Sequence, residues 1–139
     1  MNKKIYCAGP ISGDNTYQEF YKKIIQIVKE NKFIPLHEPE LKPNFNLTPQ
    51  EIYRRDIHWL TESLGVIAEV SGPSLGVGFE IAYALFNLKK PVLALYNSNA
   101  PHLSAMIRGC DSPLISVQRY SNEVELEKYI KIYLQMIIK

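Results

Sequence analysis

Apolar positions along the chain follow two different periodicities in turn. Short apolar runs typical of buried strands recur between longer segments in which apolar residues are three or four positions apart, as on one face of a helix. The strand-like runs are 3–8, 33–36, 64–68, 91–96 and 114–117. The helix-like segments are 15–31, 49–63, 76–88 and 121–137, and a shorter helix is expected within 98–110. Strand and helix therefore alternate along the whole chain.

This alternation predicts an α/β fold, because a strand that returns parallel to its neighbour needs a crossover helix on one face of the sheet. We expect a flavodoxin-like three-layer sandwich with a five-stranded parallel sheet, and Pro35 favours an edge position for the second strand. Residues 1–139 fit one domain. The flavodoxin-like order places the loops after the first and third strands side by side, where such folds bind ligands.

One helix start is specified unusually well. Thr48 is a good cap, Pro49 suits the first helical position, and Glu51 completes a capping box. The preceding helix is expected to be capped by Asp14 or Asn15. We predict that the proline-rich stretch before the well-specified helix is a loop over the site.

Composition excludes several classes of function. A hydrophobic content of 46% and a charged content of 22% are those of an ordinary globular protein. A net charge of +2 gives no reason to expect nucleic acid or a membrane surface as a partner, and no apolar run approaches the roughly 20 residues that span a bilayer. Cys7 and Cys110 are far apart, which favours reduced thiols and a cytoplasmic location. The three histidines have no metal-ligand spacing, so we expect no metal and no cofactor.

The richest chemistry lies in residues 69–80, where a buried strand ends and a helix begins. Backbone N–H groups at such a helix start attract anions, and Ser74 and Gly76 stand there. Glu80 follows, and the helix N-terminus could keep it ionised as a nucleophile. Each residue also has an ordinary structural role: Gly76 and Gly78 allow a tight turn, Ser74 caps a helix, and Glu80 interacts with the helix dipole.

Other candidate residues are individually weaker. Tyr6 belongs to the core by periodicity, although its hydroxyl at the end of a strand needs a partner. Asp56 lies among charged residues on a helix, and taken alone it is typical of a surface residue. Ser104 and Arg108 are either a cap and a surface cation or a second source of phosphate donors. The turn 9–13 has the character of a phosphate loop.

Four segments resemble the nucleoside 2-deoxyribosyltransferase superfamily, and within it the 2′-deoxynucleoside 5′-phosphate N-hydrolases most closely. They are Ile5-Tyr6-Cys7-Ala8-Gly9-Pro10-Ile11-Ser12-Gly13, Asp56-Ile57-His58-Trp59-Leu60, 68–80 and Leu103-Ser104-Ala105-Met106-Ile107-Arg108-Gly109. They occur in the family's order and are spread over most of the chain. The third and fourth segments are specific, and the first is shared across the superfamily.

The resemblance implies hydrolysis of the N-glycosidic bond of a nucleoside 5′-monophosphate. By this match Glu80 is the nucleophile, Asp56 holds the sugar hydroxyl and assists proton transfer, and Tyr6 orients Glu80. It further implies that Ser74, Gly76 and, from a neighbouring subunit, Ser104 hold the phosphate, so the enzyme would be a homodimer. The remaining substrate-binding residues that it implies are Gly9, Ile11, Ser12, Gly13 and Met106.

Ser74 favours a nucleotide over a nucleoside, because a hydroxyl can donate to a phosphate whereas the acidic residue of transferring relatives would repel it. Two alternatives stay open: deoxyribosyl transfer between bases, and a nucleotide-binding or receiver-like module without turnover. A receiver needs an acidic cluster after the first strand, where this chain has Ala8-Gly9-Pro10. The base, and the choice between ribose and deoxyribose, are not specified by any residue that we can identify.

Overall fold

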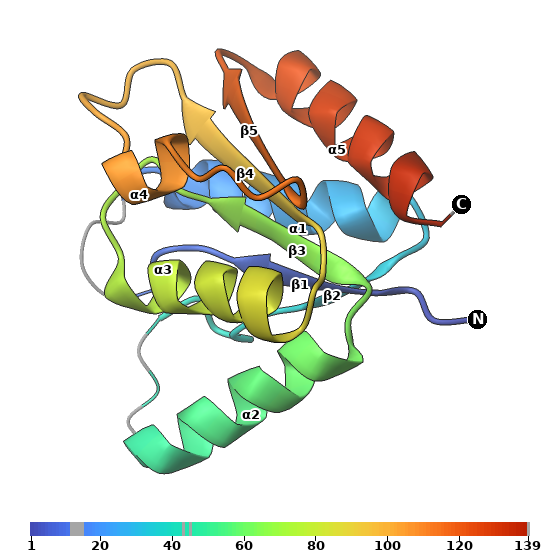
Figure 1. The fold of residues 1–139 in the computed structure, drawn as a ribbon, viewed down its shortest axis with the longest axis vertical. Helices are drawn as coiled ribbons and strands as arrows, with labels where there is room; N and C mark the ends of the chain where they lie inside the picture. The colour runs from blue at the N-terminus through green and yellow to red at the C-terminus, as the bar shows by residue number, and fades with distance from the viewer. Residues whose placement is uncertain (12–15, 43, 45, 139) are drawn as a thin grey trace.

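A computed structural model describes residues 1–11, 16–42, 44 and 46–138, and its centre is a five-stranded parallel sheet (Figure 1). The strands are β1 Lys4–Ala8, β2 Ile34–Leu36, β3 Gly65–Glu69, β4 Val92–Asn97 and β5 Ile115–Tyr120. Their order is β2-β1-β3-β4-β5, and every pair is parallel. This confirms the predicted flavodoxin-like sheet, including the edge position of the strand that contains Pro35.

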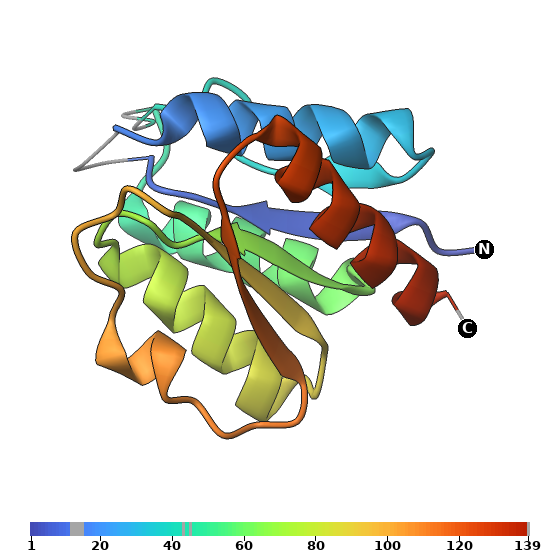
Figure 2. The same ribbon diagram turned by 90° about the horizontal axis from the view of Figure 1, so that it is seen from above.

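Helices cover both faces of the sheet and complete three layers (Figures 1 and 2). They are α1 Gln18–Glu30, α2 Pro49–Glu62, α3 Leu75–Ala82, the π-helix η1 Tyr83–Asn87, α4 Ala105–Arg108 and α5 Glu123–Ile137. Helices α1 and α5 pack together on one face, and α2 and α3 lie on the other. The predicted sandwich is therefore confirmed.

Side chains of each central strand point alternately into two cores. In β1, Ile5 and Cys7 join the core under α1 and α5, whereas Tyr6 and Ala8 join the core under α2 and α3. This is the period-two alternation that a strand covered on both faces must have. Tyr6 therefore faces the side of the sheet on which α2 and α3 lie.

Helix termini agree with the sequence signals at the start of α2 and depart from them at the start of α1 and at the end of α3. Thr48 accepts a hydrogen bond from the backbone of Glu51 and forms the complete capping box with it. Helix α1 begins at Gln18 behind Tyr17, which makes no side-chain cap, and Asp14 and Asn15 lie outside the described residues. The helix predicted over 76–88 is α-helical only to Ala82 and continues as η1, whose wider turn is closed by a bond from the N–H of Leu88 to Tyr83 O.

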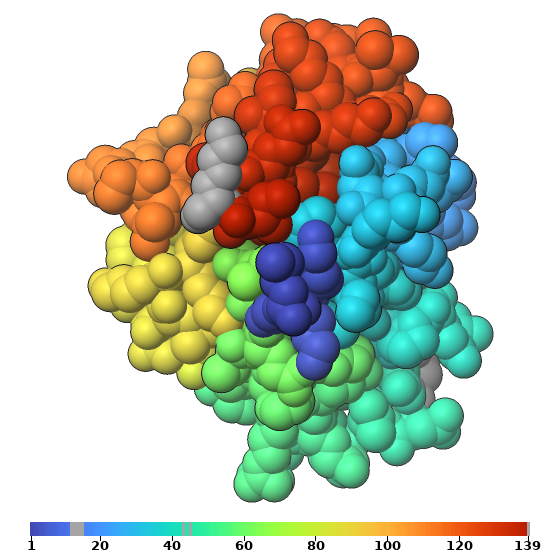
Figure 3. Space-filling view, turned by 90° about the vertical axis from the view of Figure 1, so that its right-hand side faces the viewer, coloured from blue at the N-terminus to red at the C-terminus, as the bar shows by residue number. Residues whose placement is uncertain are grey.

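The carboxyl ends of β1 and β3 lie side by side, with Ala8 paired with Ala68. The loops that follow them therefore open at the same edge of the sheet, as the strand order predicts. Figure 3 shows the right-hand side of the molecule in Figure 1, where the N-terminal segment lies. No helix in the described part of the chain has the length and apolar character needed to cross a membrane.

Candidate active site

Tyr6 of β1 and Glu80 of α3 meet on the face of the sheet that α2 and α3 cover. The Tyr6 hydroxyl donates a hydrogen bond to Glu80 Oε2, and its ring is buried in the core. Glu80 is carried by α3, whose Val77 and Ile81 are buried against the sheet on either side of it in the sequence. Burial and the adjacent Glu80 charge raise the pKa of Tyr6, which keeps its hydroxyl a donor. The polar partner that the Tyr6 hydroxyl was expected to need is thus Glu80.

Asp56 also belongs to this cluster, so its reading as a surface residue is wrong. Its side chain is only 22% exposed, and Arg55 Nε donates to its Oδ1 at 3.0 Å. Asp56 and Glu80 interact through a side-chain hydrogen bond, so α2 and α3 each contribute one carboxyl group to a pair. Two such groups in contact cannot readily both ionise.

The electrostatics of the pair favour one retained proton. Burial raises the pKa of Glu80 to about 8, the Tyr6 hydrogen bond lowers it, and the Asp56 charge raises it. Burial also raises the pKa of Asp56, against the opposing effect of Arg55. The expectation that the helix N-terminus keeps Glu80 ionised fails in the free protein, because Glu80 is the sixth residue of α3 and the dipole effect fades within the first turn.

Arg55 and Glu38 are neighbours of the pair that sequence reasoning missed. Arg55 donates to Asp56 through Nε and to Glu38 Oε2 through Nη2, and its guanidinium lies 4.6 Å from the centre of the Trp59 ring. Arg55 lies in a run of charged residues typical of a solvated helix face, and Glu38 lies in the loop after β2. Only the folded arrangement brings them together beside Asp56.

The start of α3 combines a cap with unfilled space. Ser74 Oγ accepts from the Val77 N–H at 3.2 Å, so it is a helix cap as its ordinary reading predicts, and its own hydrogen is not used in that bond. Gly76 and Gly78 lie inside α3 and not in a turn. A Cβ added at either glycine would meet no atom within 4 Å. Packing within this chain therefore does not explain these glycines.

The loop after β1 is closely packed where it is described. A Cβ at Gly9 would lie 2.5 Å from Tyr21 Cγ, so the close approach to this ring requires glycine. The Tyr21 hydroxyl donates to Cys7 O at 2.6 Å. Ile11 packs against the core under α1 and α5. Ser12 and Gly13, which the resemblance assigns to the substrate site, lie outside the described residues.

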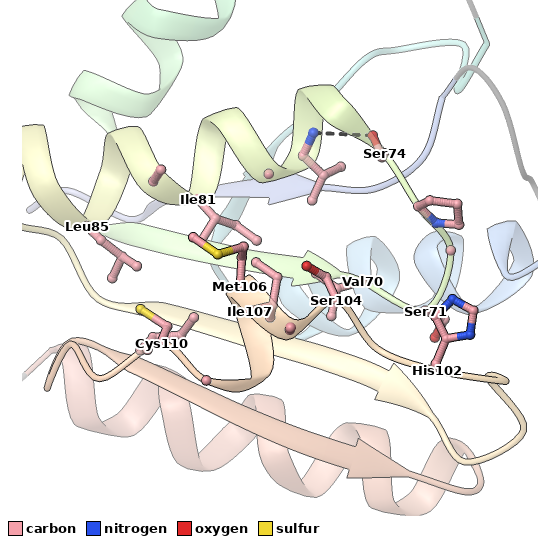
Figure 4. Close-up of a pocket in the computed structure, with 18 of the residues that line it drawn as sticks. Val70, Ser71, Ser74, Ile81, Leu85, His102, Ser104, Met106, Ile107 and Cys110 are labelled. Carbon is pink, nitrogen blue, oxygen red and sulfur yellow. Dashed lines mark hydrogen bonds between the residues drawn. The ribbon is translucent and has the colours of Figure 1, made fainter.

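A second concave feature lies on the other side of α3 from Glu80. It is a groove of about 680 Å³ between α3 and the segment that contains α4. Ser74, Ser104 and Met106 line it, and Met106 extends towards Ile81 of α3 (Figure 4). Glu80, Tyr6 and Asp56 are not among its lining residues. Ser74, Ser104 and Met106 are thus predicted site residues that line the groove and not the carboxyl pair.

Large apolar side chains are exposed around this groove. Leu75 is 97% exposed and Met106 is 83% exposed, and Phe79 and Phe86 on the same helical segment are each more than half exposed. Monomeric proteins rarely leave such a group of side chains in water. Across the described ranges, no group of three or more His, Cys, Asp or Glu side chains is arranged to hold a metal ion.

Comparison with known proteins identifies relatives over most of the chain. A family model described as nucleoside 2-deoxyribosyltransferase matches residues 5–130. A Thermofilum pendens protein, named provisionally as a 2′-deoxynucleoside 5′-phosphate N-hydrolase, is 42% identical over 76% of this chain and 77% of its own length. The 5-hydroxymethyl-dUMP N-hydrolase of Mus musculus is 37% identical over 94% of this chain and 81% of its own length.

Solved structures share the fold at lower identity. A CMP N-glycosidase of Clostridium botulinum superposes with a TM-score of 0.69 at 21% identity, covering 94% of this chain and 99% of its own. A conserved protein from Enterococcus faecalis superposes with a TM-score of 0.64 and the same identity, covering 96% of this chain and 99% of its own. At this identity the likeness concerns the fold alone.

Proposed function

The chain belongs to the nucleoside 2-deoxyribosyltransferase family, and we propose that it hydrolyses the N-glycosidic bond of (deoxy)nucleoside 5′-monophosphates. The products are the free base and (deoxy)ribose 5-phosphate. The names of its relatives support this reaction class. The observation that carries the proposal is the contact of Glu80 with both Tyr6 and Asp56.

In the first step, a carboxylate oxygen of Glu80 attacks C1′ of the sugar. The new C1′–O bond forms as the C1′–N bond breaks, and the electron pair of that bond goes to the base nitrogen. The carboxyl pair supplies the proton that the departing base needs, passed through Asp56, because Glu80 must be ionised to attack. Tyr6 holds Glu80 in place by its hydrogen bond. Retaining glycosidases likewise use one carboxylate as the nucleophile and a second carboxyl group as the acid and base.

In the second step, water opens the glutamyl–sugar ester. The water oxygen bonds to C1′, the C1′–O bond to Glu80 breaks, and a proton from the water returns to the carboxyl pair. The sum is one water consumed, one base released with a hydrogen on its nitrogen, and one sugar phosphate. The pair is then restored with its single proton, ready for another substrate.

The 5′-phosphate is held at the start of α3 in this proposal. The hydroxyl hydrogen of Ser74 is not used in the bond with the Val77 N–H and is available to a phosphate oxygen, and backbone N–H groups at a helix start favour anions. Glycine inside a helix costs about 1 kcal/mol relative to alanine. The open space beside Gly76 supports a role in which a ligand approaches the backbone closely.

We further propose that the enzyme is a homodimer in which the neighbouring subunit's Ser104 completes the phosphate site. The exposed Leu75 and Met106 support this arrangement, because a second copy would cover them. In the described residues Ser104 makes no cap hydrogen bond with its own helix, so its hydroxyl is available to a ligand. A cytoplasmic role in nucleotide salvage accords with the two free cysteines.

A panel of ribo- and deoxynucleoside 5′-monophosphates, with the matching nucleosides, tests the proposal. We expect release of free base and an equal amount of sugar 5-phosphate from at least one nucleotide, and far slower release from its nucleoside. Glu80→Ala should abolish release, whereas Glu51→Gln, at an exposed helix start away from the site, should not. Base exchange between nucleosides without phosphate would instead establish a transferase, and binding without release would establish a non-catalytic module.

A further inference from the structure

Glu69 at the end of β3 is a buried carboxylate that the reaction above does not use. Its side chain is completely inaccessible to solvent. Ser71 donates to it twice, from the backbone N–H to Oε1 at 2.7 Å and from the hydroxyl to Oε2 at 3.0 Å. The Tyr120 hydroxyl also donates to Oε2. A buried carboxylate with three donors is a satisfied group, so its burial is tolerated.

This hydrogen-bond network connects the turn of residues 71–74 to the three strands β3, β4 and β5. Besides Glu69 of β3 and Tyr120 of β5, the backbone N–H of Asn97 in β4 donates to Ser71 Oγ at 2.7 Å. Three of these bonds involve Ser71, which opens the turn of residues 71–74, and the Tyr120 bond reaches Ser71 only through Glu69. That turn leads directly into α3. The position at which α3 begins therefore depends on the network.

The two halves of α3 are held in different ways. Val77 and Ile81 are buried, so packing fixes the part of the helix that carries Glu80. At the first turn, Leu75 is 97% exposed and Gly76 has open space around it. Val77 is the buried residue of the first turn, so Leu75 and Gly76 before it have little packing of their own, and the segment 71–74 connects them to the sheet.

We propose that Glu69 is a positioning residue for the phosphate-binding end of the site, acting through Ser71 on the turn that aims Ser74 and Gly76 at the 5′-phosphate. This inference rests on the proposed function. It predicts a specific kinetic signature, because loosening the first turn weakens the hold on phosphate while packing keeps Glu80 in place. Loss of the network should raise KM for the nucleotide and leave kcat nearly unchanged.

The experiment compares Glu69→Gln, Tyr120→Phe and a matched control, Tyr133→Phe. Tyr133 is also a buried tyrosine whose hydroxyl donates a hydrogen bond, to Pro91 O at 2.8 Å, but this acceptor precedes β4 at the opposite end of the sheet. For Glu69→Gln we expect KM to rise about tenfold with kcat within about twofold of wild type, the usual scale for weakening a charged hydrogen bond. Tyr120→Phe should give a smaller rise, and Tyr133→Phe none.

Competitive inhibition by 2-deoxyribose 5-phosphate supplies a second readout. Its Ki should rise by the same factor as KM in Glu69→Gln and Tyr120→Phe, and it should not change in Tyr133→Phe. If Glu69→Gln does not fold, Tyr120→Phe decides the question alone. An unchanged KM in the folded network variants, or an equal rise in Tyr133→Phe, overturns the inference while wild-type base release leaves the proposed function intact. Absence of base release from wild type refutes the proposed function, and the inference falls with it.

Discussion

Replacement of Glu80 by glutamine should stabilise the protein, and the gain should grow with pH. Burial raises the pKa of Glu80 to about 8 from its ordinary value of 4.5. Between these values the folded protein keeps a proton that the unfolded chain has released. The free energy of unfolding of the wild type therefore falls as pH rises through this range, and it falls no further above about pH 8. Glutamine does not titrate, so the variant lacks this loss.

The size of the effect follows from the width of that window. One pH unit within it corresponds to about 1.4 kcal/mol, so the interval from pH 5.5 to 7.5 gives about 3 kcal/mol as an upper value. Asp56 interacts with Glu80 and has a raised pKa of its own, so it shares the titration. We therefore expect the difference between variant and wild type to grow by about 2 kcal/mol over this interval. The amide oxygen can still accept the Tyr6 hydrogen bond.

Urea unfolding of both proteins at pH 5.5, 6.5 and 7.5 measures this difference. Glu51→Gln is the control, because hydrogen bonds from Thr48 lower the pKa of the exposed Glu51. Its stabilising contribution is complete above the unfolded pKa, so the control should show a difference independent of pH across the interval. A pH-independent difference for Glu80→Gln as well would refute the reasoning, because Glu80 would then titrate as an ordinary glutamate.

Three further predictions address activity. The value of kcat/KM should fall above about pH 8, where the Glu80–Asp56 pair loses its proton. Arg55→Gln should move this fall to higher pH, because the Arg55 charge lowers the pKa of Glu80. An unchanged pH profile in the variant would contradict this. Gly76→Ala should stabilise the protein by about 1 kcal/mol in thermal unfolding, because alanine has the higher helix propensity and the space beside the backbone is open. The same variant should raise KM for the nucleotide, and an unchanged KM would mean that no ligand approaches the backbone there. Leu75→Glu, at a 97% exposed position, should leave the fold intact but give a monomer by analytical ultracentrifugation. Its base release should be strongly reduced, and a fully active monomer would refute the shared phosphate site.

The fold could be predicted well because its determinants are local. Each strand or helix periodicity can be recognised within one short stretch of consecutive residues, and the capping box of Thr48 and Glu51 spans only four positions. The strand order then follows from the few topologies that parallel crossovers allow. The change to a π-helix at Tyr83 was not predicted, because a helical apolar stripe does not distinguish the two helix types over one turn.

The site could be predicted only where its residues lie in one motif. Glu80 stands out from the sequence at the start of a helix, but Asp56 has charged neighbours that are typical of a solvated face. Its burial depends on how α2 packs against α3, which is not a property of the local sequence. The network around Glu69 is equally hidden, because Tyr120 is 51 residues away in the sequence.

The central claim is that Glu80 attacks C1′, and trapping the covalent intermediate tests it most directly. Wild-type protein mixed with a cleaved nucleotide would be quenched in acid within one turnover, digested and analysed by mass spectrometry. The account predicts a sugar 5-phosphate attached to the peptide that contains Glu80, and no such adduct in Glu80→Gln. Base release at the wild-type rate by Glu80→Gln, with no adduct in either protein, would contradict it.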